Sequence, residues 1–321
     1  MTTAPARRTT DGPTDDPRAE AVLTQAREQA ERARRVGREK RGAVGGVAGR
    51  LADRAGDWEL ADDPQRWLGP QRYLWNTLAD RWFRMEVDGW ENIPPGPCLL
   101  IGVHAGAPFV WDAWTVSVHW WRRFGHDRPL HGTAHDLLMG LPVYGHYFRA
   151  MGVLPAAPDS MLTALADGHD VILWPGGDTD ALRPWWRRDE AVLAGRTGFV
   201  KIAIKAGVPV VPVATTGGAD AAPVVVPGDK VASLLRLDKL LRLKSVPLSV
   251  SVPWGLAPSL LPQIPLPAKI RTRFMPPVHV EPDLELTEDD DYLRSVHDEV
   301  LASLQSGMDA LARRRKFPLF G

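Results

Sequence analysis

Short apolar segments bounded by turn-forming residues most constrain the fold of this chain. CLLIGV at 98–103 is such a segment, and an unbroken apolar run of this length is typical of a strand buried on both faces of a sheet. VILW at 171–174 and VPVVPVA at 208–214 are also predicted strands. Helical segments lie between the predicted strands, and this alternation predicts an α/β fold.

The expected architecture is a central, largely parallel or mixed sheet flanked by helices. Residues 65–85 supply an N-terminal amphipathic helical segment, because their apolar residues recur at steps of three and four and form one broad face. Gly69-Pro70 is expected to interrupt this helix. The other predicted elements are a strand at 130–133 and helices after Asp112 and at 159–167, 198–205 and 287–314.

The first 56 residues differ in composition from the rest. Residues 1–16 have almost no apolar content, which predicts disorder. Residues 18–41 are rich in Ala, Glu and Arg, which predicts a helix with a solvated charged face rather than one that contacts anionic lipid or nucleic acid. We therefore expect a basic, partly disordered N-terminal extension at 1–56 and a folded domain at 57–321.

Composition excludes several classes of protein. A formal net charge of zero argues against a nucleic-acid partner, and the single cysteine, Cys98, excludes an intrachain disulfide and fits a reducing compartment. The chain has neither a spanning apolar run nor a signal-peptide core, so we expect a cytoplasmic protein. Several of the 13 tryptophans adjoin arginines. This arrangement suits an interface with water on one side and apolar groups on the other, and the alternative is that these are ordinary tryptophans of the core and its rim.

His104 and Asp112 form the first candidate site. An aspartate bonded to one imidazole nitrogen fixes the tautomer and raises the basicity of the other, as needed to remove a proton from a hydroxyl. In an unbroken helix the two residues would lie about 12 Å apart, but Gly106 and Pro108 favour a loop that folds back. The alternative is a structural histidine followed by an N-cap aspartate.

The second candidate site is WPGGDTDALRPWWRR at 174–188, in which PGGDTDALRP at 175–184 is a predicted loop. Gly176 and Gly177 can turn backbone N–H groups toward an anion, and Arg183 brings positive charge to the same place. Further along, Arg196 and Lys201 flank a helix beginning near Gly198, and a helix N-terminus suits phosphate. Both segments and His104 should reach the carboxyl edge of one sheet. A tight turn with a solvated arginine patch is the alternative.

The order of these motifs resembles the glycerolipid acyltransferase superfamily, of the lysophospholipid and 1-acylglycerol-3-phosphate acyltransferase type. The resemblance covers about residues 60–280 and includes AKIRTRFMPPVHV at 268–280, which is similar to that family's closing strand. It implies that 57–321 is an acyltransferase domain, His104 the general base, Asp112 its orienting partner, and the donor acyl-CoA or acyl-ACP. The candidate substrate-binding residues are Gly106, Pro175, Gly176, Gly177, Arg183, Arg196 and Lys201.

Two departures from the family pattern bear on the acceptor and the mechanism. Seven residues separate His104 from Asp112 where the family usually has four. Trp-Pro-Gly-Gly stands in place of Phe-Pro-Glu-Gly, which resembles the branch that acylates neutral acceptors such as diacylglycerol. His131 and Asp136 do have the four-residue gap but follow a later strand, and residues five apart point to different sides, so they are not predicted to be catalytic.

The predicted function is O-acyl transfer from acyl-CoA or acyl-ACP to a hydroxyl of lysophosphatidic acid or a neutral glyceride. We expect the protein to act peripherally at the inner face of the membrane, docking through 233–245 and 256–267. A catalytically inactive, lipid- or membrane-binding member of the same fold is the alternative. No cofactor or metal is expected, because the six histidines between 104 and 146 do not form a His-Glu-x-x-His metallopeptidase motif. Gly-x-Ser-x-Gly is absent, and Cys98 is expected to be an inert core residue.

Overall fold

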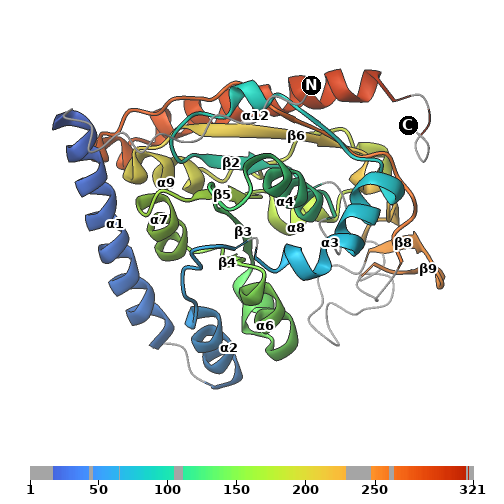
Figure 1. Cartoon of the computed structure of the whole chain (residues 1–321), viewed down its shortest axis with the longest axis horizontal. Helices are drawn as coiled ribbons and strands as arrows, with labels where there is room; N and C mark the ends of the chain where they lie inside the picture. Colours follow the sequence, from blue (N-terminus) through green and yellow to red (C-terminus); the bar gives the residue numbers. More distant parts are fainter. Residues whose placement is uncertain are drawn as a thin grey trace.

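The computed structural model describes residues 17–42, 46–64, 66–104, 111–228, 247–259, 264–315 and 317. In this part of the chain a seven-stranded mixed sheet runs in the order β1-β10-β6-β2-β5-β3-β4 (Figure 1). This confirms the predicted α/β fold. The strands are β1 (Glu86–Asp88), β2 (Leu99–Gly102), β3 (Leu130–Ala134), β4 (Leu154–Pro155), β5 (Asp170–Leu173), β6 (Val210–Thr216) and β10 (Arg271–Phe274). A smaller sheet contains β7 (Val224–Val226), β8 (Leu248–Ser251) and β9 (Gly255–Pro258).

Strand β2 occupies the centre of the large sheet. It runs parallel to β5 and β6, with Leu100 opposite Ile172 on one side and Val211 on the other. The parallel block continues through β3 and β4, while β10 is antiparallel to β6. Because β2 is covered on both faces, each of its residues is buried, as the unbroken apolar run predicts.

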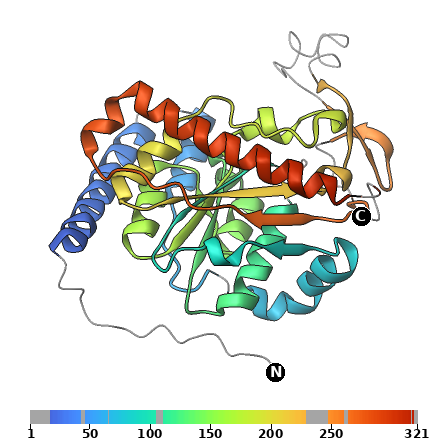
Figure 2. The same ribbon diagram turned by 90° about the horizontal axis from the view of Figure 1, so that it is seen from above.

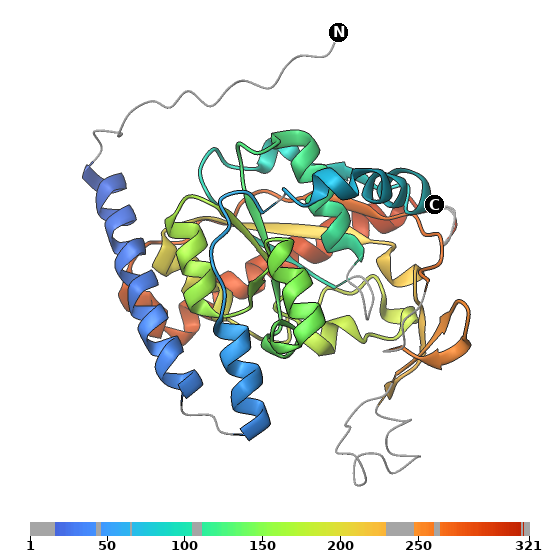
Figure 3. The ribbon, with the colours of Figure 1, turned by 60° about the horizontal axis from the view of Figure 1, so that its bottom comes forward.

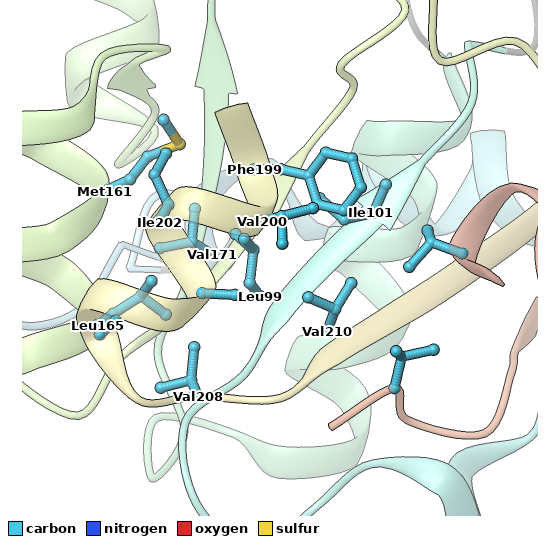
Figure 4. Packing of buried hydrophobic residues seen from close by; sticks show 14 of the residues in the cluster. Leu99, Ile101, Met161, Leu165, Val171, Phe199, Val200, Ile202, Val208 and Val210 are labelled. Atoms are coloured by element: carbon cyan, nitrogen blue, oxygen red, sulfur yellow. The ribbon is translucent and has the colours of Figure 1, made fainter. Parts of the chain in front are cut away.

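Helices cover both faces of the sheet, so the fold has three layers (Figure 2). On one face lies α4 (Trp111–Phe124), whose Trp120 packs with Leu100 and Ile172. On the other face Leu99, Ile101 and Val171 pack against α7 (Pro158–Ala166), α9 (Gly198–Ala206) and α12 (Asp290–Arg313). Figure 4 shows this second cluster at close range. The remaining helices are α1 (Pro17–Gly42), α2 (Gly46–Gly56), α3 (Leu68–Thr77), α5 (Asp136–Gly140), α6 (Pro142–Ala150) and α8 (Gly177–Ala181). Single turns of other helix types are η1 (Leu78–Trp82, π), and the 3₁₀ turns η2 (Trp90–Asn92), η3 (Trp185–Arg187), η4 (Gly218–Asp220) and η5 (Leu284–Glu288).

Helix α1 lies along α7 and α9 at one edge of the molecule (Figure 3). Ala26 and Ala30 face the core and are buried, and the guanidinium of Arg34 lies 5.3 Å from the ring centre of Trp58. The basic side chains Arg32, Arg35, Arg38 and Lys40 are exposed. The described part of the predicted extension at 1–56 is thus helical, and the boundary after residue 56 stays a prediction.

Two local predictions are wrong. Gly69-Pro70 does not interrupt a helix: α3 begins at Leu68, and Pro70 lies in the first turn, where backbone N–H groups have no intrahelical partner to lose. The segment after Trp174, expected as a loop, contains α8. The predicted docking helix at 233–245 lies outside the described residues. Within the described ranges, no helix has the length and apolarity that a membrane crossing requires.

A largely buried ion pair between Asp170 and Arg128 holds the amino end of β2. Asp170 accepts a hydrogen bond from the backbone N–H of Cys98 at 2.9 Å and receives Arg128 Nε at 2.6 Å. Arg128 also donates to the carbonyls of Pro94 and Gly96 at 2.7 and 2.8 Å. Cys98 is fully buried, and burial raises the pKa of its thiol, in keeping with an inert core residue.

Replacing Asp170 by Asn should lower the free energy of unfolding by about 3–5 kcal/mol, because the largely buried Arg128 charge loses its partner. Urea unfolding followed by circular dichroism measures this change. As the matched control, Asp80→Asn removes the carboxylate from an exposed pair with Arg122 and should cost less than about 1 kcal/mol. Equal losses in the two variants would contradict the anchoring role of Asp170.

Candidate active site

His104 lies at the carboxyl edge of the sheet, two residues beyond the end of β2. Its imidazole stacks on the indole of Trp174, which directly follows the neighbouring strand β5; the ring centres are 5.8 Å apart and the planes differ by 14°. At Gly102, the last residue of β2, a Cβ atom would lie 2.6 Å from Trp174 Nε1. The absence of a side chain at Gly102 therefore leaves room for the indole that supports His104.

The main chain of His104 is held by two side chains from the segment after Trp174. Asp180 accepts a hydrogen bond from the His104 N–H, and Arg183 Nη2 donates to the His104 carbonyl at 2.7 Å. The two side chains also pair with each other, Arg183 Nη1 lying 3.1 Å from Asp180 Oδ1, and they are 5% and 0% exposed. We call Asp180 and Arg183 the peptide clamp.

Burial sets the charge states at this edge of the sheet. It lowers the pKa of His104 to about 3, with a further lowering from the charge of Arg183. Burial also raises the pKa of Asp180 to about 6, although Arg183 and the His104 N–H favour the charged carboxylate. The His104 ring is therefore neutral at pH 7, and one of its nitrogens carries a lone pair that can take a proton. Its Nδ1 atom is buried and has no hydrogen-bond partner among the described residues.

Asp112 follows Trp111 within α4, so it lies inside the helix and not at the predicted N-cap position. Its side chain lies outside what the structure describes, as does Gly106 within the segment 105–110. The contact between His104 and Asp112 therefore stays a prediction.

The Pro175-Gly176-Gly177 turn lies between Arg196 and the peptide clamp. Arg196 Nη1 donates to the Pro175 carbonyl at 2.9 Å. A Cβ atom at Gly176 would lie 2.3 Å from Asp180 Cβ, and Gly177 has a φ of +57°, which favours glycine. The Gly177 N–H donates to the Trp174 carbonyl at 3.4 Å, a long and weak bond. Packing and backbone conformation thus explain both glycines.

A cavity of about 720 Å³ opens beside His104. Pockets of about 300–1,000 Å³ are typical of small-molecule sites. Among the described residues, the charged or titratable side chains in its wall are His104, His135 and Arg196. The wall is otherwise mainly apolar, with Leu68, Trp114, Leu130, Phe148, Met151, Met161, Phe199 and Ile202. An apolar ligand can therefore lie in the cavity with a reacting group next to His104.

The structure places some of the predicted substrate-binding residues in the cavity wall and others away from it. Pro175, Gly177 and Arg196 line the cavity, whereas Gly176 is buried beside Asp180. Arg183 is buried in the peptide clamp and faces the protein interior. Lys201 lies outside the cavity wall, with its Nζ 3.9 Å from Glu288 Oε1.

Hydrogen bonds within the protein engage both ring nitrogens of His131. Its Nδ1 lies 2.8 Å from the Gly152 carbonyl and its Nε2 3.0 Å from His169 Nδ1. Since a carbonyl only accepts, Nδ1 carries the proton and Nε2 accepts from His169. Burial lowers the pKa of His131 to about 4. Both ring nitrogens are occupied, and the side chain does not line the cavity, which agrees with the expectation that His131 and Asp136 are not the catalytic pair.

Sequence reasoning missed Asp180 and the supporting role of Trp174. One local signal existed for the first: Asp180 precedes Arg183 by three residues, a spacing at which side chains on a helix meet. Nothing in the sequence indicates that their partner is the backbone of His104, 76 residues away.

This chain is similar to several known proteins. The family model described as Acyltransferase matches residues 84–216. An uncharacterized protein of Mycobacterium tuberculosis (strain ATCC 25618 / H37Rv) is 31% identical over 287 residues, covering 87% of this chain and 76% of that protein. The DGAT1/2-independent enzyme synthesizing storage lipids of Gallus gallus is 28% identical over 153 residues, 46% of this chain and 44% of that protein. The crystal structure of the 1-acyl-sn-glycerophosphate (LPA) acyltransferase PlsC from Thermotoga maritima aligns with a TM-score of 0.42 and 17% identity, covering 89% of this chain and 97% of that one.

Gly102→Ala should lower the free energy of unfolding by about 1–3 kcal/mol, because the new methyl group overlaps the Trp174 indole. Combining it with Trp174→Phe should cost less than the sum of the two single changes, since the smaller ring relieves the overlap. Urea unfolding of all three variants measures this coupling. Gly96→Ala is the control, because a Cβ there meets nothing within 4 Å. Strictly additive energies would show that Gly102 does not make room for Trp174.

Proposed function

The chain belongs to the glycerolipid acyltransferase superfamily, and on this premise we propose that it transfers an acyl group from acyl-CoA or acyl-ACP to the hydroxyl of a neutral glycerolipid at a membrane surface. The observation that carries this proposal is the neutral imidazole of His104 in the wall of a large, mainly apolar cavity. Its position at the carboxyl edge of parallel strands is where α/β folds place their ligands.

In the proposed reaction His104 is the general base. It takes the proton of the acceptor hydroxyl as that oxygen attacks the thioester carbonyl carbon, and the carbonyl oxygen becomes negatively charged. The C–S bond then breaks, the carbonyl re-forms, and the thiol leaves with the proton from His104. Gly177 and Arg196, in the cavity wall, are assigned to the developing negative charge. Asp112 is assigned to stabilise the imidazolium.

Three observations support a neutral acceptor. The charge of Arg183 is matched by Asp180 inside the protein, and Lys201 lies away from the cavity. Arg196 is the one arginine or lysine in the described cavity wall, and it is already assigned to the negative charge that develops on the thioester carbonyl. Asp180 also fills the space that a glutamate at position 176 would need. A phosphate on the acceptor would therefore find fewer partners here than the usual Phe-Pro-Glu-Gly block implies.

The donor and the setting complete the proposal. The apolar cavity wall suits the acyl chain of acyl-CoA or acyl-ACP, with the thioester next to His104. The name of the chicken relative, an enzyme synthesizing storage lipids, supports a lipid acceptor for this chain as well. We place the reaction at the inner face of the membrane, where both substrates meet.

Replacing His104 by Ala should lower acyl transfer by at least about 100-fold, because general base catalysis contributes about 10²–10⁴. Release of thiol from acyl-CoA, with diacylglycerol or lysophosphatidic acid as acceptor, measures the rate. His126→Ala, a change at an exposed histidine, is the control and should keep full activity. Retained turnover in the His104 variant would contradict its assignment as general base. Faster transfer to lysophosphatidic acid than to diacylglycerol would contradict the proposed neutral acceptor. Wild-type protein that releases no thiol with either acceptor would favour the lipid-binding alternative.

Asp180 is proposed as a positioning residue, and its titration should appear in the pH profile. Below about pH 6 protonation of Asp180 removes the charge that pairs with Arg183, so kcat should fall there while His104, with a pKa of about 3, stays neutral. Asp180→Asn should lower kcat at pH 7 by up to about 100-fold, with little change in KM, and abolish this acid limb.

The control is Asp189→Asn, which breaks a carboxylate–arginine pair with Arg315 away from His104 and should keep the limb. A limb that persists near pH 6 in Asp180→Asn would assign it to another group and leave Asp180 a purely structural role.

A further inference from the structure

Apolar and aromatic side chains are exposed on two neighbouring helical segments. They lie on α3 with its flanking turns and on α6, and they are between 37% and 82% exposed. We call this set the aromatic surface: Trp67, Tyr73, Leu74, Trp82, Val143, Tyr144 and Tyr147. Large apolar patches of this kind on a soluble protein mark interaction sites. The apolar periodicity of 65–85 predicts one apolar face on a helix. The structure buries only part of that face, including Leu68 and Trp75.

Contacts between the segments make the aromatic surface continuous. Tyr147 of α6 donates to Gln71 of α3 at 3.4 Å. At the other end of the segment, Trp82 Nε1 donates to the Pro265 carbonyl at 3.0 Å. Residue 264 forms a bridge to Val252, next to the β8–β9 hairpin, where Trp254 and Leu256 are also exposed. In Figure 1 α6 lies at the bottom of the view and the hairpin at the right, with α3 between them.

The cavity beside His104 reaches this side of the protein. Leu68 of α3 and Phe148 of α6 belong both to the helices of the aromatic surface and to the cavity wall. Leu138 of α5 lines the cavity and is 40% exposed, so the wall meets solvent there. An apolar chain that entered beside Leu138 would meet a mainly apolar wall in the cavity that His104 also lines.

The charges around the aromatic surface are mainly positive. Arg66, Arg72 and Arg81 are exposed beside Trp67, Tyr73 and Trp82, while the acid of this segment, Asp80, is paired with Arg122 at 2.7 Å. Tryptophan and tyrosine favour the boundary between lipid headgroups and hydrocarbon, and arginines favour anionic headgroups. The same helices also supply Leu68 and Phe148 to the wall of the apolar cavity, and this position favours a lipid bilayer over a second protein chain.

We propose that the aromatic surface docks on an anionic phospholipid bilayer and places the opening at Leu138 against the lipid. The proposal rests on the proposed function in one respect, namely that the cavity takes lipid acyl chains. The predicted docking segment at 256–267 would then contact the same bilayer, because its described residues Leu256 and Ile264 are exposed at the end of the aromatic surface.

The test is co-sedimentation of the full chain with phosphatidylcholine vesicles and with vesicles containing about one third phosphatidylglycerol. Wild-type protein should bind the anionic vesicles more strongly. Tyr73→Ser/Leu74→Ser and Arg72→Glu/Arg81→Glu should each weaken binding by at least about tenfold, since surface arginines and buried apolar groups both contribute to bilayer binding. Trp186→Ser, a change at a 59% exposed tryptophan outside this surface, is the control and should bind as wild type.

Unchanged vesicle binding in both double variants would overturn the proposal. So would a dimer, seen by sedimentation velocity, that Tyr73→Ser/Leu74→Ser converts to a monomer, because a second copy would then cover the surface. Thiol release without vesicles, from a short-chain acyl-CoA and a water-dispersed acceptor, should be the same in Tyr73→Ser/Leu74→Ser and wild type. Vesicle binding without acyl transfer to any acceptor would refute the proposed function but would still support the aromatic surface as the docking surface.

Discussion

The ion pair between Asp180 and Arg183 is the interaction on which the active-site edge of the sheet depends. Two buried charges are costly unless they are paired, and here each also forms a hydrogen bond with His104, Asp180 with its N–H and Arg183 with its carbonyl. The geometry explains the surrounding residues. Asp180 needs the bare backbone of Gly176 beside it, and the ring of His104 rests on Trp174 in the space that Gly102 leaves.

The central sheet could be predicted because its signals are local. Strands β2 and β6 are buried on both faces, so their sequences are apolar without alternation, and the turn-forming residues mark where they stop. Once the strands are parallel, their carboxyl ends must meet at one edge. This geometric rule alone brings His104 and Pro175-Gly176-Gly177 together, with no knowledge of side-chain contacts.

The parts that escaped prediction depend on contacts distant in sequence. The peptide clamp joins residues 76 positions apart, and Arg183 in a turn gives the same sequence signal whether it points to substrate or into the protein. Apolar periodicity in 65–85 shows that a helix has an apolar face, but it does not show what covers that face, so the exposure of Tyr73 and Leu74 could not be foreseen. Pro70 was misjudged because a proline that breaks a helix interior also fits a first turn.

The two ends of β2 are fixed by the same chemistry. At the amino end Asp170 accepts from the Cys98 N–H and pairs with Arg128, which donates to nearby carbonyls. At the carboxyl end Asp180 accepts from the His104 N–H and pairs with Arg183, which donates to the His104 carbonyl. A short central strand held at both ends cannot slide against its neighbours. The position of the imidazole beside the cavity then follows from the backbone, and rigid support of this kind is what the proposed role of His104 as general base requires.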